Sequence, residues 1–149
     1  MSAVVWVHID ALSRDHPVFA RAGEGARAVF VWDAADMARR GWTLKRCVFV
    51  MECVEDMGVE VIEGSYAEVL AGLGAGRILT ADTPDPALRA AADAVAGLER
   101  VPGRPLTDIP ATTDMGRFFR FWNKARRSVL TPTAELPPAD PLPPVGRAR

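Results

Sequence analysis

The stretch that decides the fold is VVWVHIDALSRDHP, residues 4–17. Its first part, residues 4–9, is almost entirely apolar, and its second part gathers short polar and ionisable side chains. An apolar run without alternation is typical of a central parallel strand that helices cover on both faces. Polar residues that follow such a strand lie where open α/β sheets bind their ligands. We therefore predict a central strand over residues 4–9 and the floor of a binding crevice over residues 10–16.

The rest of the chain alternates apolar segments with segments of helical periodicity. Strands are predicted at residues 28–32, 58–62, 77–81 and 98–102, and helices at 17–22, 36–40, 43–57, 65–73 and 86–98. Such alternation predicts an α/β fold with a parallel sheet. Five strands fit a doubly wound, Rossmann-like sheet in the order 3-2-1-4-5. In that order the loops after the first and fourth strands line the switch-point crevice.

Local signals predict where two of the later helices begin. Ser65 is followed three residues later by Glu68, which is the pattern of a capping box. Near the fourth strand, Asp82 or Thr83 is predicted to cap a helix that has Pro84 in its first turn. These caps give the last two crossovers defined starting points.

Length and composition predict one globular domain. The chain has 149 residues, 49% hydrophobic and 25% charged, with a net charge of −1. A charge this small gives no global attraction for nucleic acid or a membrane surface. We expect the α/β domain to cover residues 1–130, including a terminal amphipathic helix at 115–127. The tail at 131–149 holds six prolines and is expected to be disordered.

Cysteine content and apolar runs predict the cellular setting. Cys47 and Cys53 are six residues apart on one expected helix and therefore lie on different faces, so we expect two unpaired thiols. With only two histidines in the chain, a zinc site is not expected. No apolar run approaches the roughly 20 residues of a membrane helix, and no secretion signal is visible. We expect a cytoplasmic protein.

Six polar residues at the predicted carboxyl ends of the strands are candidate ligand contacts: Asp10, Ser13, Asp33, Thr80, Asp82 and Thr83. Asp10 and Ser13 are expected either to hold a ligand's polar atoms or to close a local turn. The start of the helix after Thr83 would favour an anionic group. However, the first loop has no glycine-rich fingerprint and the chain has no Gly-Lys-Ser/Thr phosphate loop, so a conventional dinucleotide site is not expected.

Three other polar residues have structural interpretations beside their functional ones. Asp36 is predicted to cap the short helix that follows the second strand. His8 is interpreted first as a hydrogen-bonded core residue, and His16 as a solvent-facing turn residue before Pro17. Neither histidine has an evident nucleophile beside it in the sequence.

The expected terminal helix, residues 115–127, combines an apolar stripe with basic residues. Phe118, Phe121, Trp122 and Ala125 follow the i, i+3, i+4, i+7 pattern. Five basic residues surround the stripe: Arg117, Arg120, Lys124, Arg126 and Arg127. Three interpretations remain open, namely packing against the domain's own sheet, docking to a partner protein, and contact with nucleic acid through phosphates and stacked bases. Packing and docking are favoured over nucleic acid.

Several short motifs, in this order, resemble the N-terminal α/β domain of the DNA photolyase and cryptochrome family. The family's first strand carries an aromatic residue, followed by an Asp-Leu pattern and then Asp-Asn-Pro. In this chain Trp6, Asp10, Leu12, Asp15 and Pro17 match.

Later segments extend the resemblance over about residues 3–127. VFVWD at 29–33 is similar to the family's second strand, and Leu44-Lys45-Arg46 with Glu52 is similar to its next helix. Gly64-Ser65 with Glu68-Val69-Leu70 resembles its following helix start. The first loop departs from the family, which usually carries arginines beside the Asp-Leu pair, whereas this loop has only Arg14.

The resemblance implies a photolyase-type fold and a binding role. In the family, deoxyribodipyrimidine photo-lyase activity requires FAD held in a large helical domain that follows the α/β domain. The resemblance covers the α/β domain alone, so no FAD site is expected in this chain and photorepair by this chain alone is not implied. The resemblance implies either an antenna pocket for a folate, deazaflavin or flavin, or docking to a separate FAD-binding protein or a second copy. A nucleotide-acting enzyme of the same topology is the alternative.

Overall fold

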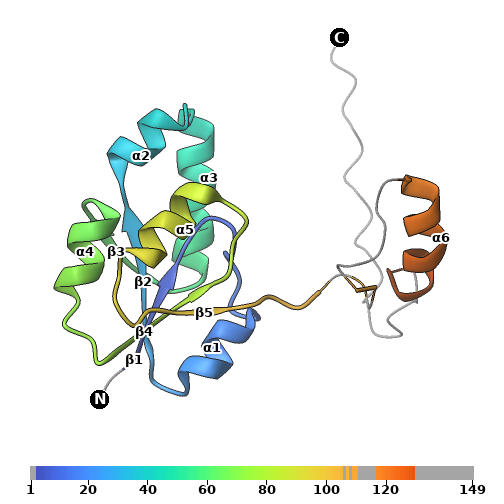
Figure 1. Ribbon diagram of the computed structural model, residues 1–149. Coiled ribbons are helices and arrows are strands. Elements are labelled where there is room, and N and C mark those ends of the chain that lie inside the picture. The colour runs from blue at the N-terminus through green and yellow to red at the C-terminus, as the bar shows by residue number, and fades with distance from the viewer. Residues whose placement is uncertain (1–2, 106, 108, 111–116, 130–149) are drawn as a thin grey trace, which may run out of the picture. The chain divides into compact units, whose positions relative to one another are not determined.

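A computed structural model describes residues 3–105, 107, 109–110 and 117–129. The chain separates into two compact units, Met1–Arg104 and Pro105–Arg149. The first unit contains a five-stranded parallel sheet, and the second contains one described helix (Figure 1). The expected disordered tail at 131–149 lies outside the described residues.

The first unit alternates strands and helices along the chain, as predicted. Its elements are β1 (Ala3–Val7), α1 (Pro17–Ala22), β2 (Arg27–Trp32), α2 (Ala34–Arg39), α3 (Leu44–Asp56), β3 (Glu60–Glu63), α4 (Tyr66–Gly72), β4 (Arg77–Ala81), α5 (Pro86–Asp93) and β5 (Glu99–Val101). The sheet order is β3-β2-β1-β4-β5, and every pairing is parallel. This confirms the α/β fold class and the order 3-2-1-4-5.

Burial on both faces explains the unbroken apolar run of β1. Val5 and Val7 belong to a core formed with α1 and α3, whereas Val4 and Trp6 belong to a second core formed with α4 and α5. Helices therefore cover both faces of the sheet (Figure 1). Successive strand residues point to opposite faces, so both sets must be apolar.

Several boundaries differ from the predictions for physical reasons. β1 ends at Val7, because the carbonyl of His8 accepts the backbone N–H of Ala11 in a turn that leaves the sheet. α5 ends at Asp93, well before the predicted residue 98, and a turn leads from it to β5. The predicted start of the terminal helix, at residues 115–116, lies outside the described residues. α6 is described as Phe118–Val129.

No helix in the described part of the chain is both long and apolar enough to span a membrane. Cys47 and Cys53 are both free on α3, and each is partly buried.

Candidate functional site

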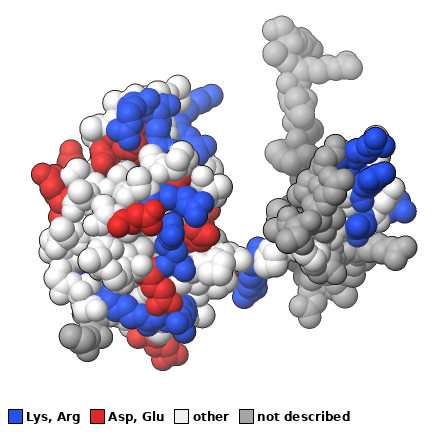
Figure 2. Space-filling view, viewed as in Figure 1, with Lys and Arg blue, Asp and Glu red and all other residues white. Residues whose placement is uncertain are grey.

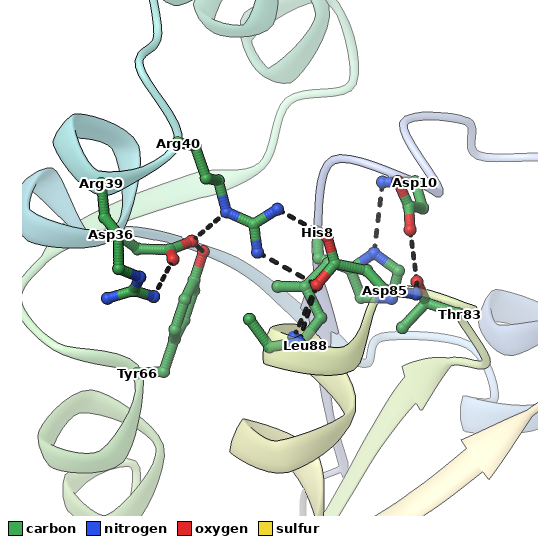
Figure 3. Close-up of polar contacts among 10 residues, drawn as sticks. His8, Asp10, Asp36, Arg39, Arg40, Tyr66, Thr83, Asp85 and Leu88 are labelled. Atoms are coloured by element: carbon green, nitrogen blue, oxygen red, sulfur yellow. Dashed lines mark hydrogen bonds and ion pairs between the residues drawn. The ribbon is translucent and has the colours of Figure 1, made fainter.

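The candidate site lies at the carboxyl edge of the sheet, where β1 and β4 are neighbours and their crossovers diverge. Side chains from the loop after β1, from the loop after β4 and from the α2 region converge there (Figure 3). This is the switch point that the strand order predicted, and its location follows from topology. The side chains that meet there decide what the site can hold.

Thr83 joins the loop after β1 to the start of α5. Its hydroxyl donates to a carboxylate oxygen of Asp10, and its oxygen accepts the backbone N–H of Asp85 at 3.0 Å. Thr83 is buried, whereas Asp10 is exposed. Two predicted ligand residues are therefore brought together, and one carboxylate oxygen of Asp10 is bonded to Thr83.

Asp85 caps α5 and pairs with Arg40. One carboxylate oxygen accepts the backbone N–H groups of Ala87 and Leu88 at 2.9 and 3.1 Å. Both oxygens also accept from the Arg40 guanidinium, at 2.5 and 3.1 Å. The hydrogen bonds from Arg40 hold the pKa of Asp85 well below its usual range. The anion position at this helix start is thus filled by the chain's own carboxylate.

Asp36 forms the other end of the same ionic network. Its buried carboxylate accepts from Arg40 Nε at 2.6 Å, from the Tyr66 hydroxyl at 3.1 Å and from the Arg39 guanidinium (Figure 3). Burial and the adjacent Asp36 charge both raise the pKa of Tyr66. A carboxylate with 3% of its side chain exposed requires such partners to remain charged.

Asp33 begins α2, which corrects the prediction that Asp36 is the cap. The Asp33 carboxylate accepts the backbone N–H of Asp36 at 2.9 Å and that of Tyr66 at 3.2 Å. It therefore fixes the starts of both α2 and α4. Asp36 lies inside the first turn, where its side chain is available for Arg40. Both carboxylate oxygens of Asp33 are thus used within the fold.

His8 connects the ends of β1 and β4, and both of its ring nitrogens are used. Nε2 donates to the Ala81 carbonyl at 2.9 Å, and Nδ1 accepts the Asp10 backbone N–H at 3.3 Å. A carbonyl only accepts and an amide N–H only donates, so these partners require the neutral Nε2–H form. Burial lowers the pKa of His8, which agrees with a neutral ring. The structural interpretation of this histidine is therefore confirmed.

The remaining predicted ligand residues are spread around the edge. Thr80 is buried and donates to the Trp6 carbonyl at 2.8 Å. Ser13 accepts the backbone N–H of Asp15 at 3.2 Å, which closes a turn. Asp82 is exposed and, with Thr83, lines an open hollow of about 280 Å³ whose other walls are Pro84, Arg89, Pro102 and Gly103.

The predicted cap of α5 is wrong, because the helix begins two residues later than Thr83 and Pro84 would place it. Asp85 is the cap and Pro86 occupies the first turn, in place of Asp82 or Thr83 with Pro84. Thr83 instead closes the turn before α5, because its oxygen accepts the backbone N–H of Asp85 while its hydroxyl donates to Asp10. The Ser65 cap is confirmed, since its hydroxyl oxygen accepts the Glu68 N–H at 3.3 Å. The Ser65 hydroxyl in turn donates to the Glu68 carboxylate at 2.7 Å.

Sequence reasoning missed four residues that organise this edge: Asp36 as an ion-pair member, Arg40, Tyr66 and Asp85. The dipeptide Asp85-Pro86 is a local signal for the α5 cap, but Thr83-Pro84 offers the same signal two residues earlier. The i, i+4 spacing of Asp36 and Arg40 is a local signal for that ion pair, whereas nothing local indicates the bond from Arg40 to Asp85, which is 45 residues away in the sequence. His16 does more than the predicted turn residue would, because its Nδ1 accepts the Val18 N–H and caps α1.

In the second unit, α6 presents an aromatic cluster that consists of Phe118, Phe119 and Trp122. Phe118 and Phe119 are 63% and 75% exposed, and Trp122 stacks on Phe118 with ring centroids 6.1 Å apart. Phe121 and Trp122 are partly buried, and Ala125 is buried. Basic side chains gather on this helix, which carries no acidic residue (Figure 2).

These contacts limit the chemistry of the switch-point edge. Asp36, Arg40 and Asp85 are paired with one another, and the two ring nitrogens of His8 are occupied. An anionic ligand at the start of α5 would have to displace Asp85 from both Arg40 and the helix N–H groups. No group of three or more metal-ligating side chains occurs within the described residues.

Protein-family models, curated proteins and solved structures were each compared with this chain, and none matched.

Proposed function

We propose that this chain is a photolyase-type binding domain that docks a separate flavoprotein through the aromatic cluster of α6. The observation that carries the proposal is the exposure of Phe118 and Phe119 on a helix whose polar face is entirely basic or neutral. Burying one phenylalanine side chain is worth roughly 1.5–3 kcal/mol, so two exposed rings represent a substantial unused driving force.

The chemistry of α6 defines what the partner must present. Aromatic residues dominate the energy of protein interfaces, and Phe118 stacked on Trp122 is already an ordered anchor. Arg117, Lys124 and Arg126 border the cluster in the sequence and favour a partner with an acidic rim around an apolar groove. A flavoprotein is proposed because the resembling family joins this segment to its FAD-binding helical domain.

The state of the switch-point edge supports docking over catalysis or ligand capture there. Asp10, Asp33, Thr80 and Thr83 all form hydrogen bonds within the fold. Using them for a ligand would first break these bonds, and a buried group left without a partner costs about 1–3 kcal/mol. The exposed rings of α6 carry no such cost.

The test is capture of a flavoprotein by the tagged full chain from extracts of the cells that make it. The proposal expects a captured protein with the blue absorption of a bound flavin, and loss of that protein with Phe118→Lys. Glu24→Lys, at an exposed position in the first unit, is the control that should retain it. Capture without flavin, or equal capture by Phe118→Lys, would overturn the proposal.

A second candidate function is supported by the hollow of about 280 Å³ beside β4 and β5. Asp82 and Arg89 offer opposite charges at its wall, and it lies at the edge where α/β sheets bind ligands. A folate, deazaflavin or flavin antenna is the ligand class that the family resemblance implies. The test is the absorption spectrum and native mass of the untagged chain, in which a bound chromophore lost in Arg89→Glu would favour this function.

A further inference from the structure

The outer face of α3 exposes more apolar surface than a helix of a doubly wound sheet requires. Leu44, Val48 and Phe49 are 80%, 48% and 54% exposed, whereas Val50 and Val54 on the opposite face are fully buried. A helix with one apolar stripe needs only its buried side to fold. The exposed residues line a shallow hollow of about 310 Å³ together with Lys45 and Glu52.

The arrangement of these residues is symmetric along the helix. Lys45, Val48, Phe49 and Glu52 follow the i, i+3, i+4, i+7 pattern, so they form one stripe. The apolar pair is central, and a charge of opposite sign lies at each end. Neither Lys45 nor Glu52 forms an ion pair within the described part of the chain.

We propose that this stripe binds the same stripe of a second copy, with the two α3 helices antiparallel. A two-fold axis between Val48 and Phe49 places Lys45 of each copy opposite Glu52 of the other. The same axis brings the two Val48–Phe49 pairs together. A parallel arrangement would oppose Lys45 to Lys45 and Glu52 to Glu52, which like-charge repulsion disfavours. The surface is therefore self-complementary, as a two-fold interface requires.

The extent of the stripe determines the strength of the association. Stable interfaces bury roughly 1,200–2,000 Å² in total, and a single helix face from each copy offers less than that. We therefore expect a weak dimer that dissociates on dilution. It uses the first unit only and is independent of the docking proposed for α6.

The experiment is sedimentation velocity of the full chain over a concentration series from low micromolar to millimolar. The wild type should pass from monomer to dimer as concentration rises. Phe49→Lys should weaken the dimer at least about tenfold, because it places a charge at the centre of the interface. Thermal unfolding of each variant checks that the fold is retained. A wild type that stays monomeric, or a Phe49→Lys variant that dimerises equally, would overturn the proposal.

Charge reversal tests the antiparallel geometry. Lys45→Glu and Glu52→Lys should each weaken the dimer several-fold, and Glu24→Lys, an exposed residue outside the stripe, should not. The double variant Lys45→Glu/Glu52→Lys should recover it, because the opposed charges are again of opposite sign. An equimolar mixture of the two single variants should also associate, as a heterodimer. Failure of both recoveries would exclude this pairing.

Discussion

Arg40 and Asp85 bind each other across the switch point of the sheet, with nitrogen–oxygen distances of 2.5 and 3.1 Å. Arg40 follows α2, on the β2 side, and Asp85 starts α5, after β4. Figure 3 shows this pair beside His8, the residue that follows β1. An ion pair of the protein itself thus lies at the sheet edge where this topology usually binds a ligand.

Replacing Asp85 tests how much this ion pair contributes to stability. Asp85→Ala removes both the α5 cap and the Arg40 partner, so it should lower the free energy of unfolding by about 2–3 kcal/mol. Asp85→Asn keeps a good capping residue and loses only the charge, so it should cost about 1 kcal/mol. Urea denaturation of both variants measures the difference, and equal losses would contradict the dual role.

Removing Asp36 should destabilise the fold far more than removing its exposed partner Arg39. Asp36→Ala leaves Arg40 and Tyr66 without the buried carboxylate that both bind. It should therefore lower the free energy of unfolding by about 3 kcal/mol or more. Arg39→Ala removes a side chain that is 67% exposed, and it should cost about 0–1 kcal/mol. Thermal and urea unfolding compare the two. A large loss of stability in Arg39→Ala would contradict this account, because it would show that the exposed ion pair contributes strongly.

His8 should make the fold less stable as the solution becomes acidic. Burial lowers its pKa in the folded protein, so the unfolded chain binds this proton more readily. The neutral ring's contribution to the free energy of unfolding is fully present above the unfolded pKa of about 6.5. It is lost as pH falls below that value toward the lower folded pKa. In His8→Gln the free energy of unfolding should depend less on pH in this window.

His16→Gln is the control for that measurement. Burial also lowers the pKa of His16, but this ring is only partly buried, so removing it should flatten the profile less. Unfolding curves collected at a series of pH values would compare the variants. An unchanged profile in His8→Gln would show that this ring is not the source of the pH dependence.

Gly64 should tolerate no side chain, in contrast to Gly58. Gly64 has a φ of +150°, and a Cβ there would lie 2.9 Å from Cγ2 of Val69, a stiff side chain. Gly64→Ala should therefore cost about 2 kcal/mol or more. Gly58 has a φ of +59° with open space around it, so Gly58→Ala should cost about 1 kcal/mol. Similar losses in both would contradict the steric argument.

The sheet order could be predicted because five strands alternating with helices fit the doubly wound order, and the apolar run of β1 identifies it as a central strand. The sequence also predicted where the site lies, at the carboxyl edge beside β1 and β4, but not which side chains bind one another there. The segment Asp82-Thr83-Pro84-Asp85-Pro86 offers two registers of cap and proline, and local rules do not choose between them. The choice depends on Asp10 and Arg40, which are distant in the sequence and adjacent only after folding.

The central claim is that this chain works by docking a flavoprotein through α6. The most direct measurement is native mass spectrometry, with an absorption spectrum, of what the tagged full chain captures from its own cells. The account predicts a complex with an FAD-loaded protein that Phe118→Lys abolishes and Glu24→Lys retains. A chain that carries a small chromophore by itself, lost in Arg89→Glu and unaffected by Phe118→Lys, would contradict it.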